Sequence, residues 1–136
     1  MYKHILYATD LRDDHPKAEK QAFKLAKAAG AKLALVHVIE PIQAYGYPGS
    51  GDLQAPLIDY ARKMMAKLGT HLQIGLPDQH IEFGSVKAAV LAVAEKIKAD
   101  LIVVGSHDRH GLGRLLGSGA QAVANHAKCD VLIVHC

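Results

Sequence analysis

The residues best suited to chemistry in this chain form a glycine-rich stretch from Gly105 to Gly119. It follows the apolar run from Asp100 to Val104 and precedes a segment, Ala120 to Ala127, with helical spacing. Glycines let backbone N–H groups approach an anion, and the N-terminus of a helix attracts negative charge. A strand, a glycine-rich loop and a helix start in this order therefore predict a phosphate-binding loop.

One side chain in this stretch opposes an anionic ligand. Asp108 places a carboxylate among the groups that would hold phosphates. A carboxylate about 4 Å from a phosphate oxygen costs roughly 4 kcal/mol at an effective dielectric constant of about 20, or about a thousandfold in affinity, when nothing compensates it. Neighbouring Arg109, His110 and Arg114, or a magnesium ion bridging Asp108 to a phosphate, would compensate. The residues are thus consistent with two outcomes, exclusion of a phosphate by Asp108 or a phosphate held despite it.

Five apolar runs rich in β-branched residues predict the strands that must position this loop, at His4–Ala8, Lys32–Val38, Gln79–Phe83, Asp100–Gly105 and Val131–His135. Runs such as Leu101–Val104 are apolar on both faces, which a parallel sheet requires when helices cover both of its sides. The expected fold class is therefore α/β, a Rossmann-like five-stranded parallel sheet in the order 3-2-1-4-5 with helices on both faces.

Helical spacing separates the strands. Pro16 fits the first turn of the first helix and Gly30 its stop, while Ser85 caps the third helix and is not read as a nucleophile. The helices are expected at about His15 to Ala29, at about Leu53 to Leu68, at Val86 to Lys98, and from Gly117 or Ser118 to a point before Lys128.

In such a sheet, ligands bind beyond the carboxyl ends of the strands where the strand order reverses. The order 3-2-1-4-5 brings Ala8, Thr9 and Asp10 beside the loop at Gly105, with Val38 nearby. Asp10 would accept hydrogen bonds from a ribose or help to hold magnesium; the alternative is that it only caps a turn. We favour the ligand role because of its expected location.

Composition sets further bounds. A chain of 136 residues, half of them hydrophobic and without a linker-like break, predicts one domain, 1–136. No apolar run approaches membrane-spanning length and no signal-peptide region is evident, so we expect a cytoplasmic protein without a membrane partner. The net charge of +3 is too scattered for a nucleic-acid groove.

Other site types do not match the residues. Cys129 and Cys136 would lie roughly 20 Å apart along a strand, which excludes an intrachain disulfide and predicts reduced thiols. The nine histidines lack metal-site spacing, so no metal site is assigned. The run Gly111-x-Gly113-x3-Gly117 resembles a dinucleotide-binding fingerprint, but it follows the fourth strand and no strand with an acidic end comes about 20 residues later. Walker-type and hydrolase-elbow motifs are missing, and no residue is assigned a catalytic role.

The order of segments resembles the universal stress protein family along essentially the whole chain. The matching segments are Tyr2–Asp10, Leu35–Val38, the turn at Gly84, Ala99–His107, and Gly117–Ser118 followed by Cys129–Val134. The resemblance implies ATP, with magnesium, as the candidate cofactor. ATP-binding members have G-x-x-G-x9-G-[ST] after the fourth strand, which this chain matches at Gly105, Gly117 and Ser118.

The chain departs from that pattern at Asp108, which replaces the second glycine, and the interval from Asp108 to Gly117 holds eight residues, one fewer than the pattern. Family members that do not hold ATP have also lost these glycines. The residues that would contact a nucleotide are Ala8, Thr9, Asp10, Val38, Val104, Gly105, His107, Asp108, Gly117, Ser118, Gly119 and Ala120.

Three functions follow, in order of preference. The first is a stress-response binding protein that binds adenine nucleotide weakly or not at all. The second is an ATP-dependent switch with slow hydrolysis at most, and the third a nucleotidyl-transferring enzyme on the same fold. We expect a homodimer, because an apolar edge strand invites pairing with its copy and the resemblance implies the same; its interface residues would be Val131, Leu132, Ile133 and Val134.

Overall fold

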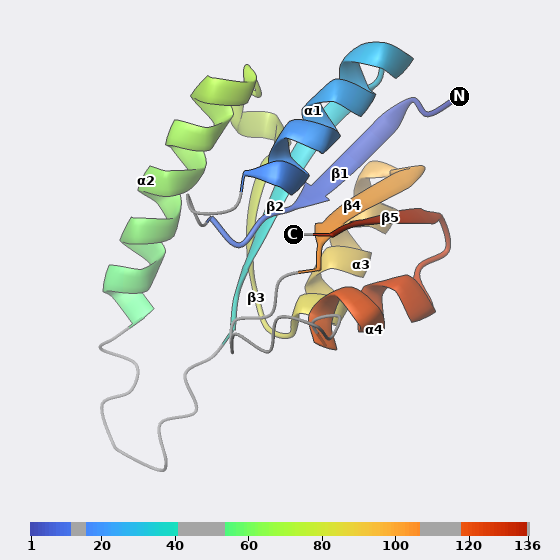
Figure 1. Cartoon of the computed structure of the whole chain (residues 1–136). Coiled ribbons are helices and arrows are strands. Elements are labelled where there is room, and N and C mark those ends of the chain that lie inside the picture. The colour runs from blue at the N-terminus through green and yellow to red at the C-terminus, as the bar shows by residue number, and fades with distance from the viewer. Residues whose placement is uncertain (12–15, 41–53, 107–117, 136) are drawn as a thin grey trace.

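The chain folds as a five-stranded parallel sheet in the order β3-β2-β1-β4-β5, as predicted (Figure 1). The computed structural model describes residues 1–11, 16–40, 54–106 and 118–135. The strands are β1 (His4–Ala8), β2 (Lys32–Ile39), β3 (Gln79–Phe83), β4 (Leu101–Gly105) and β5 (Asp130–Val134), and the helices are α1 (Lys17–Ala29), α2 (Gln54–Leu72), α3 (Val86–Ile97) and α4 (Ser118–His126). A short 3₁₀ helix, η2 (Leu76–Asp78), precedes β3.

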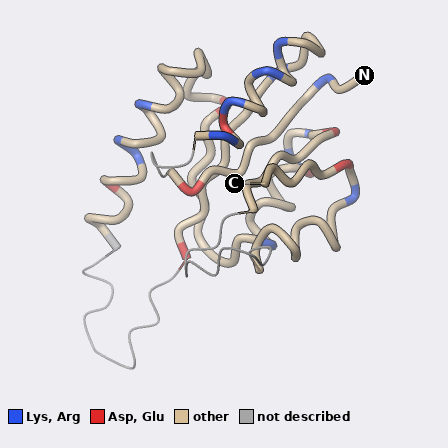
Figure 2. Tube along the Cα trace, in the orientation of Figure 1, with Lys and Arg blue, Asp and Glu red and all other residues tan. Residues whose placement is uncertain are grey.

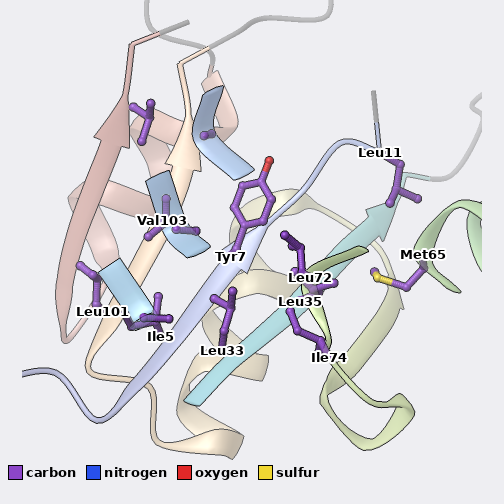
Figure 3. Close-up of a cluster of buried hydrophobic side chains, with 14 of the residues drawn as sticks. Ile5, Tyr7, Leu11, Leu33, Leu35, Met65, Leu72, Ile74, Leu101 and Val103 are labelled. Carbon is purple, nitrogen blue, oxygen red and sulfur yellow. The ribbon is translucent and has the colours of Figure 1, made fainter. Parts of the chain in front are cut away.

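Two apolar clusters lie on the two faces of the sheet. On the face covered by α1 and α2, Tyr7, Leu35 and Val103 project from three strands into one apolar cluster, which also includes Met65 and Leu72 of α2 (Figure 3). On the opposite face, α3 and α4 cover a cluster that includes Leu6, Val36, Ile102, Val90 and Val123. Side chains alternate between faces along a strand, so strands apolar on both faces fill both clusters.

Three of the predicted strands were wrong by one residue at one or both ends. β2 extends to Ile39 because that residue pairs with Phe83 and its carbonyl accepts the Gly84 N–H at 3.1 Å. β4 starts at Leu101, which pairs with Ile5, while Asp100 just before it donates its backbone N–H to the His4 carbonyl at 2.9 Å and accepts the N–H groups of Lys3 and His4 on its carboxylate at 2.8 and 3.1 Å. The last strand shifts to Asp130–Val134 to pair with Leu101–Gly105.

The helix ends also differ from the sequence prediction. α1 begins at Lys17 with Pro16 as its N-cap, and the residue predicted to start it, His15, lies outside the described residues. α2 begins at Gln54 and continues past Leu68 to Leu72, because Leu72 is buried in the core. α3 ends at Ile97, one residue early, with Lys98 in the left-handed conformation (φ 57°).

Three predicted helix caps and boundaries are confirmed. Ser85 caps α3, its hydroxyl accepting the Ala88 N–H at 3.1 Å. Gly30 ends α1 in the left-handed conformation, with φ 64°. The last helix, α4, starts at Ser118 and ends before Lys128. These residues fix where the chain enters and leaves the helices that flank the sheet.

The Lys, Arg, Asp and Glu residues that the structure describes lie outside this core. Lys and Arg are distributed along α1 and α2 and at the ends of strands in the described part of the chain (Figure 2). No helix among the described residues is both long enough and apolar enough to cross a bilayer.

Candidate functional site

The carboxyl ends of β1 and β4 lie side by side. Ala8 pairs with Val104 on one side and with Val36 of β2 on the other. The Thr9 N–H extends the ladder by donating to the Val36 carbonyl at 2.9 Å. Because consecutive strands along the chain lie to one side of β1 and β4 lies to its other side, this is where the strand order reverses and where α/β sheets bind ligands.

Beyond β4 the chain leaves the sheet beside β5. Gly105 pairs with Val134, and the Ser106 N–H donates to the Val134 carbonyl at 2.9 Å. The predicted site residues His107, Asp108 and Gly117 lie outside the described residues. The structure therefore places both ends of the predicted phosphate loop, at Gly105 and Ser118, but not its interior.

The start of α4 packs closely against α3. A Cβ built on Gly119 would lie 3.1 Å from Val86 Cγ1, and Ala120 is buried, whereas Ser118 is exposed. A larger residue at 119 would push α4 away from α3. The glycine at this position thus has a packing role, in addition to any approach of its N–H to an anion.

The predicted residues divide between the two faces of the sheet. Val38 and Val104 are buried on the face of α3 and α4, and Ala8 packs against the same cluster. Thr9 instead lines a cleft on the opposite face, and its hydroxyl oxygen accepts the Leu11 N–H at 3.0 Å. Asp10, which lies between Thr9 and Leu11 in the sequence, is exposed. The nucleotide site that sequence reasoning predicted therefore draws on residues from both faces.

His37 was missed as a site-positioning residue. Its side chain is 9% exposed, and its Nδ1 lies 2.8 Å from the Thr9 carbonyl oxygen. Since a carbonyl only accepts, Nδ1 carries the proton and donates to Thr9. This bond ties the carboxyl end of β1 to β2. A polar residue inside the otherwise apolar run of β2 was the available signal.

Comparisons with known proteins identify the family. The family model described as the universal stress protein family matches residues 1–135. The chain belongs to the universal stress protein family. Universal stress protein A homolog 1 of Coxiella burnetii is 42% identical over 139 residues, which span 98% of this chain and 96% of that protein.

Solved structures place this universal stress protein among known folds. Universal stress protein UspA from Lactobacillus plantarum superposes with a TM-score of 0.80 at 25% identity, covering 98% of this chain and 97% of that one. A universal stress protein solved in complex with cAMP has a TM-score of 0.68 at 28% identity over the same shares. At least one protein of similar fold and sequence therefore binds an adenine nucleotide.

A cleft of about 640 Å³ also opens in this universal stress protein, between α1, α2 and the residues that follow β1. Its lining residues are Thr9, Leu11, Glu19, Met64, Lys67, Leu68, Thr70 and His71. Sequence reasoning did not predict it, because its residues come from three elements and match no motif. In the described part of the chain, no three His, Cys, Asp or Glu side chains gather closely enough to hold a metal ion.

Proposed function

We propose that this universal stress protein is a homodimeric stress-response binding protein of the cytoplasm, with one domain, 1–136, that binds adenine nucleotide weakly or not at all. The nucleotide would lie at the carboxyl ends of β1 and β4. The observation that carries the proposal is the pairing of Ala8 with Val104 where the strand order reverses, with α4, which starts at Ser118, as the next described element after β4. Of these residues, Ser118 matches a phosphate-binding position of the family pattern, and the pattern assigns the nucleoside to the neighbouring Asp10 and Val38.

Asp108 is the reason for weak binding. It replaces a glycine of the family pattern, and a carboxylate about 4 Å from phosphate would lower affinity about a thousandfold if uncompensated. The related structure with cAMP supports an adenine nucleotide as the ligand class, because it shares the fold and 28% of its sequence with this chain.

An ATP-dependent switch is the second candidate. It is favoured by α4, a nine-residue helix whose first N–H groups at Ser118 and Gly119 are suited to hold phosphates. In this case a magnesium ion would bridge Asp108 to the phosphates and remove the repulsion. We assign no catalytic residue, and nucleotidyl transfer remains the third and least favoured function.

Dimerisation through β5 is the second part of the proposal. Among the described strands β5 pairs with β4 alone, so its other edge would offer backbone groups to a second copy. Backbone groups of successive strand residues point to alternate sides. Since the Val134 carbonyl faces β4, those of Val131 and Ile133 face outward.

Calorimetric titration with Mg-ATP and with cAMP tests the nucleotide part, using the unchanged chain and Asp108→Gly. Weak or undetectable binding that strengthens in Asp108→Gly supports the proposal. Micromolar binding of Mg-ATP by the unchanged chain would favour the switch instead. Binding by neither protein would contradict a nucleotide site whose weakness comes from Asp108.

A further inference from the structure

The cleft between α1 and α2 is distinct from the proposed phosphate loop, and Thr9 is the residue of the proposed nucleotide site that also lines it. It lies on the face of the sheet covered by α1 and α2, whereas Val38 and Val104 of the proposed nucleotide site lie on the other face. Its volume of about 640 Å³ falls within the range of small-molecule sites, about 300–1,000 Å³.

The floor of the cleft is apolar. Leu11 is 6% exposed and lies at the end of the sheet near Met65 of α2 (Figure 3), while Met64 and Leu68 are half-buried. Methionine is unbranched and flexible, so it adapts to the shape of an apolar ligand. These side chains provide an apolar surface that a hydrocarbon group would cover.

This apolar surface continues along one stripe of α2. At about 100° per residue, Met64, Lys67, Leu68 and His71 fall within a sector about 100° wide. Leu57 and Tyr60 fall in the same sector and are 38% and 58% exposed, so they extend the stripe toward the N-terminus of α2. From residue 57 to residue 71 the stripe is about 21 Å long at 1.5 Å per residue. A linear ligand would follow it.

The end of the stripe near the C-terminus of α2 carries the basic side chains Lys67 and His71. His71 Nε2 lies 3.9 Å from Glu19 Oε1, so the acidic side chain of the cleft has a basic neighbour within it. Lys67 lines the same cleft, is exposed, and forms no ion pair with any other described residue. A ligand with an anionic group would therefore complement Lys67 at this end of the cleft.

We propose that the cleft binds a medium-chain alkyl carboxylate. The carboxylate would lie at Lys67, and the alkyl chain would run over Leu11, Met64 and Leu68 toward Tyr60. This inference does not depend on nucleotide binding, because none of these side chains belongs to the proposed nucleotide site. It adds an amphipathic anion to the ligands of this fold.

Calorimetric titration with sodium decanoate, below the concentration at which it forms micelles, tests the inference. The expected result is saturable binding of one decanoate per chain, weakened about tenfold in Lys67→Gln, since a charge-assisted hydrogen bond is lost. Lys63→Gln is the matched control, because Lys63 is an exposed lysine of α2 that does not line the cleft; it should bind decanoate like the unchanged chain.

Two further arms separate the parts of the proposal. Met64→Glu places a carboxylate on the apolar floor and should abolish binding, while acetate, which lacks the chain, should not bind. Decyltrimethylammonium, with the same chain and a positive head group, should bind at least tenfold more weakly than decanoate. Equal binding of the two decyl compounds, an unchanged affinity in Lys67→Gln, or no saturable decanoate binding would overturn the proposal.

Discussion

Gly69 of α2 should be required for stability, although replacing glycine by alanine within a helix usually stabilises it. A Cβ at position 69 would overlap the Gln79 side chain and lie 2.9 Å from the Ile74 carbonyl oxygen. The Gln79 amide donates to that same carbonyl at 2.8 Å. Gly69→Ala would therefore displace Gln79, break this hydrogen bond and push against a backbone atom that cannot move alone.

The magnitude follows from opposing terms. Alanine gains about 1 kcal/mol of helix propensity over glycine. The lost hydrogen bond costs about 1 kcal/mol, and overpacking of a buried position costs about 1–3 kcal/mol. The net expectation for Gly69→Ala is a loss of about 1–3 kcal/mol in the free energy of unfolding.

Urea denaturation followed by circular dichroism would measure this loss. Gly75→Ala is the matched control, since a Cβ there meets only Pro77 Cδ at an ordinary 3.6 Å, and its stability should change by less than about 0.5 kcal/mol. A Gly69→Ala variant that is as stable as the unchanged chain, or more stable, would show that helix propensity outweighs the clash with Gln79 and Ile74.

Two further predictions concern His80 and the free edge of β5. Burial, and secondarily Lys96, lower the pKa of His80, and its Nε2 is buried without a hydrogen-bond partner among the described residues. The folded state thus binds fewer protons than the unfolded state, so this contribution to stability is complete above pH 6.5 and is lost as the pH falls through the folded-state pKa of His80. The variant His80→Gln should therefore flatten the decline in the urea midpoint between pH 7.5 and pH 5.5. An unchanged decline would exclude His80 as its source. Ile133→Pro removes a backbone N–H that faces away from β4. Light scattering should therefore find a monomer in place of the proposed dimer, with an unchanged circular dichroism spectrum. A variant that stays dimeric would place the interface elsewhere.

Most of the fold could be predicted because its strands are apolar on both faces. Leu101–Val104 is buried throughout, and such a run fits a covered parallel sheet and little else. The exact ends of the strands were harder to predict, since they depend on partners that are distant in the sequence. The carboxylate of Asp100, just before β4, accepts the N–H groups of Lys3 and His4, which are almost a hundred residues away in the sequence.

The site was predictable only in part. Ala8 and Val104 were correctly expected to be neighbours, because the strand order alone brings their ends together. The role of His37 and the cleft at Lys67 were not foreseen. Both depend on which face a side chain occupies after helices from separate parts of the chain have packed. No local motif encodes such an arrangement.

The most direct test of nucleotide exclusion by Asp108 compares the affinity of Asp108→Asn for Mg-ATP with that of the unchanged chain. Both are measured by calorimetry at one salt concentration and pH. Asparagine keeps the shape of the side chain and removes only its charge. If the Asp108 carboxylate repels the phosphates, affinity should rise by up to about a thousandfold. Equal affinities in the two proteins, whether tight or undetectable, would contradict exclusion of the nucleotide by this charge.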